Sequence, residues 1–341
     1  MVQAYGADTG NGSAEQPQAG ESRFGGLWNR LKQDRGVWRR GIVLALCSVL
    51  LTLPMVVHAR IPNRFGNLGS LTETFLPWIA LFIPVLLVLA LLRRSATAIV
   101  ALLLPAVVWL NVFGGLLTDK SGAGGDLTVA THNVNADNPD PGGTAEQVAG
   151  SGADVVALQE LPGGQVSTYE KSLADRYPYH SVQGTVGLWS KYPLADTRPV
   201  DIKMGWTRAM RSTVKAPQGE VAVYVAHLPS VRVKLHAGFT ANQRDDSADA
   251  LGEAIADEPV RRVVLLGDLN GTMNDRSLNA VTSQMRSTQG AAGDGFGFSW
   301  PASFPMARID QIMVKGVEPQ ASWTLAATDS DHLPIAARVE L

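Results

Sequence analysis

Three apolar stretches near the N-terminus constrain this 341-residue chain more than any other feature. Each is almost free of charge and approaches the ~20 residues that an α-helix needs to cross a ~30 Å hydrocarbon layer. They occupy residues 41–59, 75–92 and 96–117. The pattern predicts three transmembrane helices. A cleaved signal peptide and a buried soluble helical hairpin are the alternatives, but the two later stretches and the lack of an obvious small-residue cleavage site favour retained spans.

Lysine and arginine in the short flanks predict how the chain is oriented. Five of them lie within residues 30–40, before the first stretch, and Arg93 and Arg94 separate the second stretch from the third. The first loop offers only Arg60 and Arg64. Because cations in short loops stay on the cytoplasmic side, we expect a multi-pass protein of the cell membrane with a cytoplasmic N-terminus. Three crossings then place everything after residue 117 outside the cell.

Composition divides the chain into four parts. Residues 1–38 are expected to form a largely disordered cytoplasmic tail, because their first part is rich in Gly, Ala, Ser and Gln and has no apolar period. Residues 39–117 hold the three transmembrane helices, and residues 118–125 form a short Gly-rich linker that keeps the next domain close to the membrane. Residues 126–341 form the extracellular domain. The single cysteine lies in the first span, so this domain has no disulfide.

Within the extracellular domain, short β-rich runs alternate with helical or loop segments, which is typical of α/β layering. Helices are predicted at residues 145–152 and 241–257, the second with Arg244 and several acids on a solvated face. Strands are predicted at residues 127–134, 154–161, 185–191, 220–228, 263–270, 308–316 and 333–341.

Polar side chains stand at the ends of nearly all the predicted strands. Taken singly, each is compatible with a turn or a surface position. Strand ends are where open α/β sheets gather ligand sites, so together the residues predict one site. Neighbouring buried carboxylates need a compensating cation, and oxygen ligands without cysteine favour Mg²⁺, or Mn²⁺, over zinc. The residues are Asn133, Glu160, His227, Asp268, Asn270, Asp310, Asp331 and His332.

The order and rough spacing of these residues resemble the motifs of the endonuclease/exonuclease/phosphatase superfamily. The resemblance covers about residues 126–341 and implies a deoxyribonuclease I-like fold, a sandwich of two mixed β-sheets flanked by helices. It also implies a Mg²⁺-dependent hydrolase of phosphoric esters or diphosphates. The segments that carry it are THNV with Asn133, ALQEL with Glu160, GDLN with Asp268 and Asn270, RID with Asp310, and SDH with Asp331 and His332.

The resemblance implies metal and proton roles for five residues. Glu160 would be the main metal ligand, helped by Asn133 and by Asp331 through water. Asp310 would orient His332 through a hydrogen bond and stabilise its cationic form.

The GDLN and VAHL segments receive the remaining roles. Asp268 would orient or deprotonate the attacking water, while Asn270 and His227 would donate to phosphoryl oxygens. Whether Asp268 or His332 takes the proton stays open. Alternation predicts Asp268 and Asn270 on one side of their strand, and Gly267 is expected to allow close backbone approach at the metal-phosphate site. Gln311 departs from the residue that relatives often carry after Asp310.

One segment matches no motif of the superfamily. Residues 230–246 carry Arg232, Lys234, His236 and Arg244. These cations either contact a substrate phosphate or belong to a solvated loop.

Charge and tethering guide the choice of substrate. Residues 126–341 hold 18 of the 29 lysines and arginines and 25 of the 31 acids, a formal charge of −7. This balance, without a basic run, disfavours a nucleic-acid partner. A site held just above the outer leaflet meets membrane lipid at high effective concentration, which favours a lipid-linked phosphate.

The overall layout resembles the membrane-anchored teicoplanin-resistance proteins of the VanJ type, in which three spans precede an external domain. The resemblance implies action on an undecaprenyl-linked phosphate or pyrophosphate of cell-wall synthesis and a contribution to glycopeptide resistance. An extracellular nuclease and a sphingomyelinase-like or phospholipase C-like phosphodiesterase are alternatives. A non-enzymatic membrane component of an envelope stress response is another.

Overall fold

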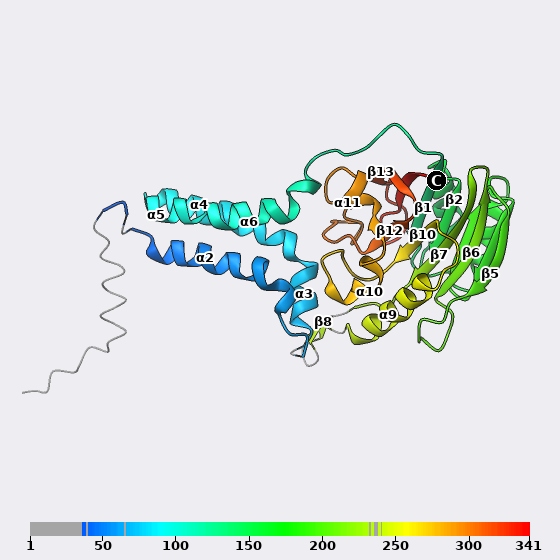
Figure 1. Ribbon diagram of the computed structural model, residues 1–341, viewed down its shortest axis with the longest axis horizontal. Helices are drawn as coiled ribbons and strands as arrows, with labels where there is room; N and C mark the ends of the chain where they lie inside the picture. The colour runs from blue at the N-terminus through cyan, green and yellow to red at the C-terminus, as the bar shows by residue number, and fades with distance from the viewer. Residues whose placement is uncertain (1–35, 39, 65, 232, 235–237, 240) are drawn as a thin grey trace, which may run out of the picture.

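The chain folds into a helical stalk (residues 41–117) that ends against a β-sandwich domain (residues 126–341), as the computed structural model shows (Figure 1). The structure describes residues 36–38, 40–64, 66–231, 233–234, 238–239 and 241–341. Most of the predicted N-terminal tail therefore lies outside the described residues.

Two six-stranded sheets form the sandwich. Both are mixed, because each contains one parallel pair, β1 with β2 and β7 with β10, among antiparallel neighbours. The first has the order β13-β14-β1-β2-β4-β3, built from β13 (Glu318–Thr324), β14 (Ile335–Glu340), β1 (Leu127–Asn133), β2 (Val155–Gln159), β4 (Val186–Ser190) and β3 (Tyr179–Gln183). The second has the order β11-β12-β10-β7-β6-β5, built from β11 (Arg286–Ser287), β12 (Asp310–Lys315), β10 (Val263–Asp268), β7 (Gly219–His227), β6 (Ala209–Ala216) and β5 (Leu194–Pro199).

The core lies between the two sheets, where alternate side chains of each strand point inward. Val129, Val155, Val223 and Leu266 are fully buried there. Burying one such side chain contributes roughly 1.5–3 kcal/mol. Apolar contacts on the outer faces hold α7 (Pro141–Ala149) and α8 (Val166–Leu173) on the first sheet, and α9 (Asn242–Ala256) and α10 (Asn279–Thr282) on the second. The predicted sandwich of two mixed sheets flanked by helices is therefore confirmed.

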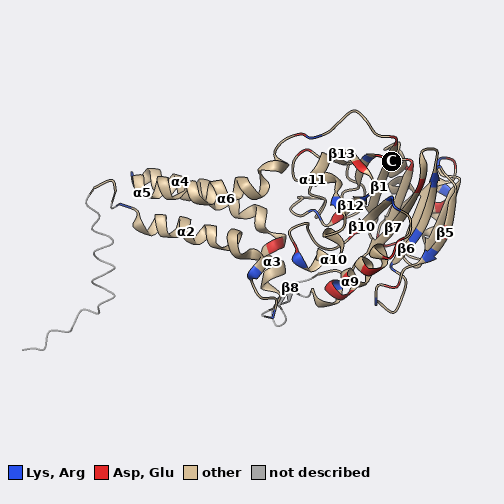
Figure 2. Ribbon diagram, in the orientation of Figure 1, with Lys and Arg blue, Asp and Glu red and all other residues tan. Residues whose placement is uncertain are grey.

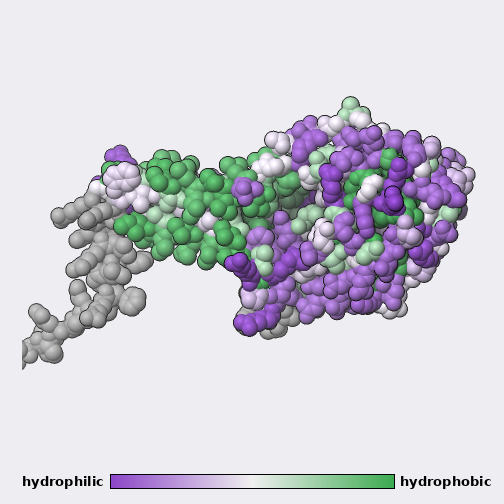
Figure 3. Space-filling model, in the orientation of Figure 1, coloured by the Kyte–Doolittle hydropathy of each residue, from purple (hydrophilic) through white to green (hydrophobic). Residues whose placement is uncertain are grey.

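The stalk consists of apolar helices that lie side by side (Figure 1). Their surface is hydrophobic along its length (Figure 3), and they carry almost no charged residues (Figure 2). They are α2 (Ile42–Val57) with η1 (His58–Arg60), α4 (Phe82–Leu92) after η2 (Leu76–Leu81), α5 (Ala96–Ala101), α6 (Leu103–Phe113) and η3 (Gly114–Leu116).

The three predicted spans are only partly reproduced. Two continuous helical segments, Ile42–Arg60 and Ala96–Leu116, are long and apolar enough to cross a membrane. The second predicted span corresponds to the helical segment Leu76–Leu92. This segment is the longer arm of a bent pair, because α3 (Leu68–Thr74) meets it at 66°. It counts as a third span if the pair is one crossing. Hydropathy alone missed the bend, because the polar residues of α3 bind the sandwich domain.

Several elements differ from the sequence-based expectation. Strands β3, β5, β6 and β13 and helices α8, α10 and α11 (Thr288–Ala292) were not predicted. Helix α7 starts earlier than expected, because Asp140 caps it by accepting from Gly143 N at 2.9 Å and Pro141 suits its first turn. Helix α9 was expected to place Arg244 on a solvated face, which is wrong. Arg244 is 1% exposed, since carboxylates pair with its guanidinium.

Candidate active site

The residues predicted to form a site converge at one edge of the sandwich, where the parallel strands end. Asn133 ends β1, Glu160 follows β2, and His227 and Asp268 end β7 and β10. A cavity of about 530 Å³ opens there, which we call the catalytic cavity. Five of the eight predicted residues line it, namely Glu160, Asp268, Asn270, Asp331 and His332. Asn133, His227 and Asp310 contact these lining residues from behind.

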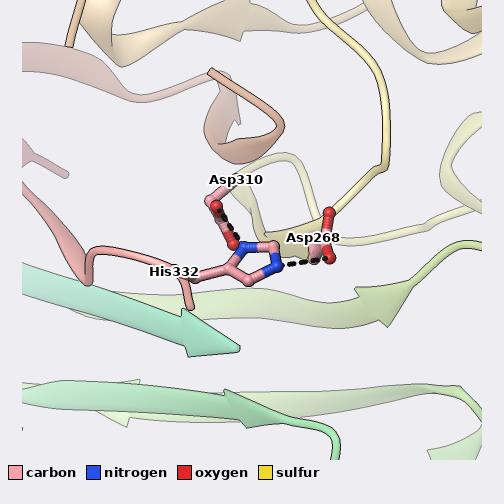
Figure 4. Close-up of side chains that lie close together, drawn as sticks. All are labelled: Asp268, Asp310 and His332. Atoms are coloured by element: carbon pink, nitrogen blue, oxygen red, sulfur yellow. Dashed lines mark hydrogen bonds and ion pairs between the residues drawn. The ribbon is translucent and has the colours of Figure 1, made fainter. Parts of the chain in front are cut away.

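His332 lies between two carboxylates, as Figure 4 shows. Its Nδ1 donates to Asp310 Oδ2 at 2.9 Å, and its Nε2 is 3.9 Å from Asp268 Oδ2. Ser299 Oγ also donates to Asp310 Oδ2, at 2.6 Å. Burial alone would lower the pKa of His332, but the charge and hydrogen bond of Asp310, with Asp268 nearby, raise that pKa above its usual range. His332 is therefore an imidazolium at neutral pH.

Asp268 is the carboxylate whose proton affinity is raised. Burial and then the charge of Asp310 raise the pKa of Asp268, against the opposing effects of His332 and hydrogen-bond donors. Its donors are Asn133 Nδ2 at 3.0 Å, Asn270 N at 2.8 Å and Asn270 Nδ2 at 3.2 Å. A carboxylate that titrates closer to neutral pH is suited to accept a proton from water. This favours Asp268 over His332 as the proton acceptor, the question that the sequence left open.

Glu160 occupies a strained backbone position at the mouth of the site. Its φ is 60°, a left-handed value that costs a non-glycine residue on the order of 1–3 kcal/mol. Its Oε1 accepts from Asn133 Nδ2 and its Oε2 from Ala136 N, both at 3.1 Å. The side chain is partly exposed to the cavity. Glu160 is thus held rigidly with a carboxylate available to a ligand.

The carboxylates of the site fit a hard divalent cation. Asp268, Asp310 and His332 offer ligand atoms within 4.8 Å of one another, and Asp310 Oδ1 is buried with no hydrogen-bond partner among the described residues. A protonated His332 cannot bind a metal, however, so Glu160 with the neighbouring Asn133 is the better match for Mg²⁺ or Mn²⁺. Asp331 lines the same cavity and accepts from Trp300 Nε1 at 3.4 Å. Its water-mediated metal contact stays a prediction.

His227 is paired with an arginine that the sequence analysis missed. Arg208 Nη2 donates to the His227 ring, and His227 Nε2 is 3.5 Å from Glu160 Oε1 and 3.7 Å from Asp268 Oδ2. Burial, then the charges of Arg208 and His332, lower the pKa of His227, so its ring is neutral. Arg208 is therefore a second cation beside the carboxylates. It directly precedes β6, a strand that was not predicted, so no motif pointed to it.

The side chains of Asp268 and Asn270 in the GDLN segment lie together as expected, but not through alternation along the strand. Strand β10 ends at Asp268, and Asn270 lies beyond it with a left-handed φ of 47°. The two side chains still meet, because Asn270 Nδ2 donates to Asp268 Oδ2 and to Leu228 O. A Cβ on Gly267 would lie 1.9 Å from Ala226 O. The glycine is therefore required for pairing with β7, and the expected close approach at the phosphate site is not its structural role.

Arg244 neither faces a substrate nor lies in a solvated loop. Its Nη1 donates to Asn270 O at 2.9 Å and lies 2.7 Å from Asp275 Oδ2. It therefore supports the loop after β10 from beneath. Arg232 and His236 lie outside the described residues, as does the side chain of Lys234. Gln311 is buried and donates to Arg308 O.

Comparisons with known proteins agree with this geometry. The family model described as Endonuclease/Exonuclease/phosphatase family matches residues 130–332. A functionally unknown conserved protein from Enterococcus faecalis V583 has 17% identity and a TM-score of 0.53, covering 62% of this chain and 99% of its own. D. rerio TDP2 complexed with single strand DNA product has 18% identity and a TM-score of 0.53, with coverages of 63% and 99%. A mannosyl-6-phosphatase of Bacteroides thetaiotaomicron VPI-5482 has 18% identity and a TM-score of 0.51, with coverages of 63% and 100%. These likenesses show a shared fold. No curated protein matches the chain.

Proposed function

The chain belongs to the endonuclease/exonuclease/phosphatase family, and on that premise we propose that it is a membrane-anchored phosphoesterase acting on a lipid-linked phosphate or pyrophosphate at the outer face of the cell membrane. The observation that carries the hydrolytic part is the convergence of Glu160, Asp268 and the Asp310–His332 pair on one cavity. Enzymes of this fold typically depend on a divalent metal. We propose Mg²⁺ as the ion.

The residues divide the work of hydrolysis among themselves. A metal held by Glu160 and Asn133 would neutralise phosphoryl charge when bound. Asp268 accepts a proton from the attacking water as the new oxygen–phosphorus bond forms. His332 donates its Nε2 proton to the leaving oxygen as the old bond breaks, and Asp310 holds the imidazolium in place. After the product leaves, Asp268 can return its proton to His332 through a bridging water, since their side chains are 3.9 Å apart.

Arg208, His227 and Asn270 act on the phosphoryl oxygens. The neutral ring of His227 would donate a hydrogen bond to them, while Arg208 adds positive charge behind His227. The amide of Asn270 would donate to them by giving up its bond to Asp268 Oδ2 or to Leu228 O, because these two bonds use both of its hydrogens. None of these three residues needs to change protonation state during the reaction.

The positions of the charged ends of the stalk support the outer-face assignment. The start of α2 and the turn between α4 and α5 lie together at the end away from the sandwich (Figure 1), where Ala96 N donates to Val37 O. Arg40, Arg93 and Arg94 lie at this end. Cations mark the cytoplasmic side, which supports the proposal that the sandwich domain lies outside the cell.

The length of the middle arm supports three crossings. Its six 3₁₀ and eleven α-helical residues rise roughly 28 Å. This nearly matches the ~30 Å hydrocarbon layer. This length supports the proposal that Leu76–Leu92 crosses the membrane while α3 lies against the sandwich domain.

The substrate proposal combines the tether with charge. The domain bears a formal charge of −7, which disfavours the nuclease alternative despite the DNA product bound to D. rerio TDP2. A site beside the membrane meets lipid phosphates at high effective concentration. We infer an undecaprenyl-type substrate and a contribution to teicoplanin resistance from the layout of spans and external domain, which resembles the VanJ type.

A substrate panel tests the proposal. Purified full-length protein in detergent is assayed with Mg²⁺ against undecaprenyl pyrophosphate, undecaprenyl phosphate, sphingomyelin, phosphoinositide and plasmid DNA. Metal-dependent release of phosphate from an undecaprenyl substrate, lost in Asp268→Asn, supports the proposal. Plasmid nicking would identify a nuclease instead. No turnover of any substrate, with teicoplanin protection retained by Asp268→Asn in cells, would identify a non-enzymatic component.

A further inference from the structure

The sandwich domain does not wall the catalytic cavity by itself. Among the described residues of the stalk, Thr74 and Phe75 line this cavity, at the corner between α3 and η2. Trp300 and Ile309 of the sandwich domain line it as well. This corner lies within the bent helix pair that leads into the membrane. The cavity that holds His332 therefore reaches the junction of the stalk and the sandwich domain.

Polar contacts fix the corner in place. Ser70 Oγ donates to Asp275 Oδ1 at 3.3 Å, and Arg276 N donates to Glu73 Oε2 at 3.2 Å. Ser70 and Glu73 are both fully buried. Buried polar groups are costly unless they are paired, so these contacts hold α3 in one register on the sandwich domain.

Aromatic contacts hold the opposite wall. Trp78 of η2 stacks on Phe298 with ring centroids 5.7 Å apart, and its Nε1 donates to Met306 O at 2.7 Å. The loop between Phe298 and Met306 contains Ser299, which bonds Asp310, and Trp300, which lines the cavity. The stalk thus positions both walls of the cavity mouth.

A second, smaller cavity lies at the junction of the stalk and the sandwich domain. We call it the apolar recess, and its volume is about 100 Å³. It shares Thr74 with the catalytic cavity. The stalk contributes Pro77, Phe113 and Leu116, and the sandwich domain contributes Met273, Phe296 and Phe298.

Apolar side chains line part of the recess, and neutral polar residues line the rest, namely Thr74, Thr272, Asn274, Ser287, Gln289 and Gln311. Its only charged lining residue is Arg308, which is buried and donates Nη1 to Gly297 O at 2.8 Å. The surface of the stalk, which contributes Pro77, Phe113 and Leu116 to the recess, is hydrophobic (Figure 3). Thr74 thus lines both the catalytic cavity, which holds the carboxylates, and the recess at the stalk junction.

We propose that the apolar recess binds the first carbons of the lipid chain of the substrate, so that an amphiphilic phosphate enters from the bilayer between the stalk and the sandwich domain. The inference rests on the proposed function and adds how the lipid is recognised. The phosphate lies at His332, the head-proximal carbons pass Thr74 and Phe75 into the recess, and the rest of the chain stays in the membrane. The small volume of the recess admits only this first part of the chain.

A chain-length comparison tests the proposal on the full protein in phosphatidylcholine nanodiscs. The measured quantity is kcat/KM for undecaprenyl phosphate divided by kcat/KM for methyl phosphate, whose single carbon is too short to reach the recess. Leu116→Gln and Met273→Gln each place a polar amide in the recess, from the stalk and from the sandwich domain. Each is expected to lower the ratio about tenfold, because apolar contact with the chain is lost. Leu117→Gln is the matched control, since Leu117 is exposed and does not line the recess.

Two results would overturn the recess as a chain site. One is an unchanged ratio in both variants, and the other is an equal loss on both substrates, which indicates a structural role alone. If the parent hydrolyses neither phosphate, the proposed function fails, and photolabelling decides on the recess. An alkyl phosphate with a diazirine on its first carbons should label peptides that contain Leu116 and Met273, with undecaprenyl phosphate competing. Labelling confined to other peptides would refute the recess.

Discussion

At the scale of single residues, the surroundings of Asp268 and Asp310 shift the pKa values of these two carboxylates in opposite directions. Asp310 is bonded to a cationic histidine and a serine, and these interactions outweigh burial to hold its pKa below the usual range. Asp268 is dominated by burial and by Asp310, so its pKa is raised. Environments that push the pKa values of two acids apart are how one site obtains both a base and a permanent anion.

Asp268→Asn should therefore abolish most turnover without unfolding the protein. Asparagine keeps the size of the side chain and removes the proton acceptor, so kcat should fall ~10²-fold or more while the melting temperature changes little. The comparison is a kinetic assay with undecaprenyl phosphate beside Asp294→Asn, an exposed control. Full activity of a well-expressed Asp268→Asn protein would rule out a catalytic role.

Glu160→Gln should weaken metal dependence. The amide keeps the size of the side chain but removes the negative charge that a divalent ion requires. The Mg²⁺ concentration for half-maximal activity should rise roughly tenfold or more. Thermal stabilisation by Mg²⁺ or Mn²⁺ gives a readout that does not depend on turnover. A variant that Mg²⁺ stabilises as strongly as it stabilises the parent would place the metal elsewhere.

Arg208→Lys tests the cation that sequence reasoning missed. Lysine keeps the charge but loses the guanidinium whose Nη2 contacts the His227 ring and Leu228 O. We expect kcat/KM to fall about tenfold for short and long phosphates alike, because the contact lies at the reacting group. A purely structural arginine would give a lower melting temperature with kcat unaltered.

At the scale of elements, strands built from apolar runs were predictable and strands with paired buried charge were not. Strand β10 is apolar until Gly267 and Asp268, so both its existence and its functional end could be read from sequence. Strand β6 is interrupted by Arg211, which looks like a surface residue but is 2% exposed. Its partner Glu258 lies 47 residues away, beyond β7 and α9. Long-range pairing of this kind leaves no local signal.

The lack of a local sequence signal for long-range contacts also explains why Arg208 and Ser299 were not predicted as site residues. The eight predicted residues stand at strand ends in recognisable segments, whereas Arg208 starts an unpredicted strand and Ser299 belongs to a loop that the stalk holds. Their roles depend on contacts between distant parts of the chain. The bend at Phe75 was missed likewise, because it follows from the docking of α3 on the sandwich domain.

The Arg211–Glu258 pair predicts acid sensitivity of the second sheet. Burial raises the pKa of Glu258, but hydrogen bonds from Arg211, Val260 N and Tyr224 outweigh it and lower the pKa to about 2. A depressed folded pKa stabilises above the unfolded value of 4.5, and this stability is lost as pH falls from there towards the folded pKa. Glu258→Gln should thus cost on the order of 3 kcal/mol at about pH 7.

The cost should shrink as the parent becomes protonated. Denaturant unfolding of the full protein in detergent, at about pH 7 and about pH 3, gives the two differences in unfolding free energy between parent and variant. A difference that is the same at both pH values would show that Glu258 keeps an ordinary pKa in the folded protein.

At the scale of the whole molecule, the contacts between α3 and the sandwich domain bear on the proposed membrane topology independently of hydropathy. Ser70 and Glu73 of α3 bond the sandwich domain, so the loop after α2 lies at the same end of the stalk as that domain. Val37 bonds Ala96, so the start of α2 shares a side with the turn before α5. The two groups lie at opposite ends of the stalk (Figure 1). If the stalk spans a membrane, as we propose, both pairings require three crossings.

Cysteine accessibility in intact cells measures this arrangement directly. In a Cys47→Ala background, Leu68→Cys and Asp119→Cys should react with a membrane-impermeant maleimide added outside. Val37→Cys should react only after permeabilisation, because the cationic end of the stalk stays in the cytoplasm. All three positions are exposed in the structure. If the bent pair did not cross, Leu68→Cys and Asp119→Cys would label on opposite sides, and the contacts between α3 and the sandwich domain could not form in the membrane.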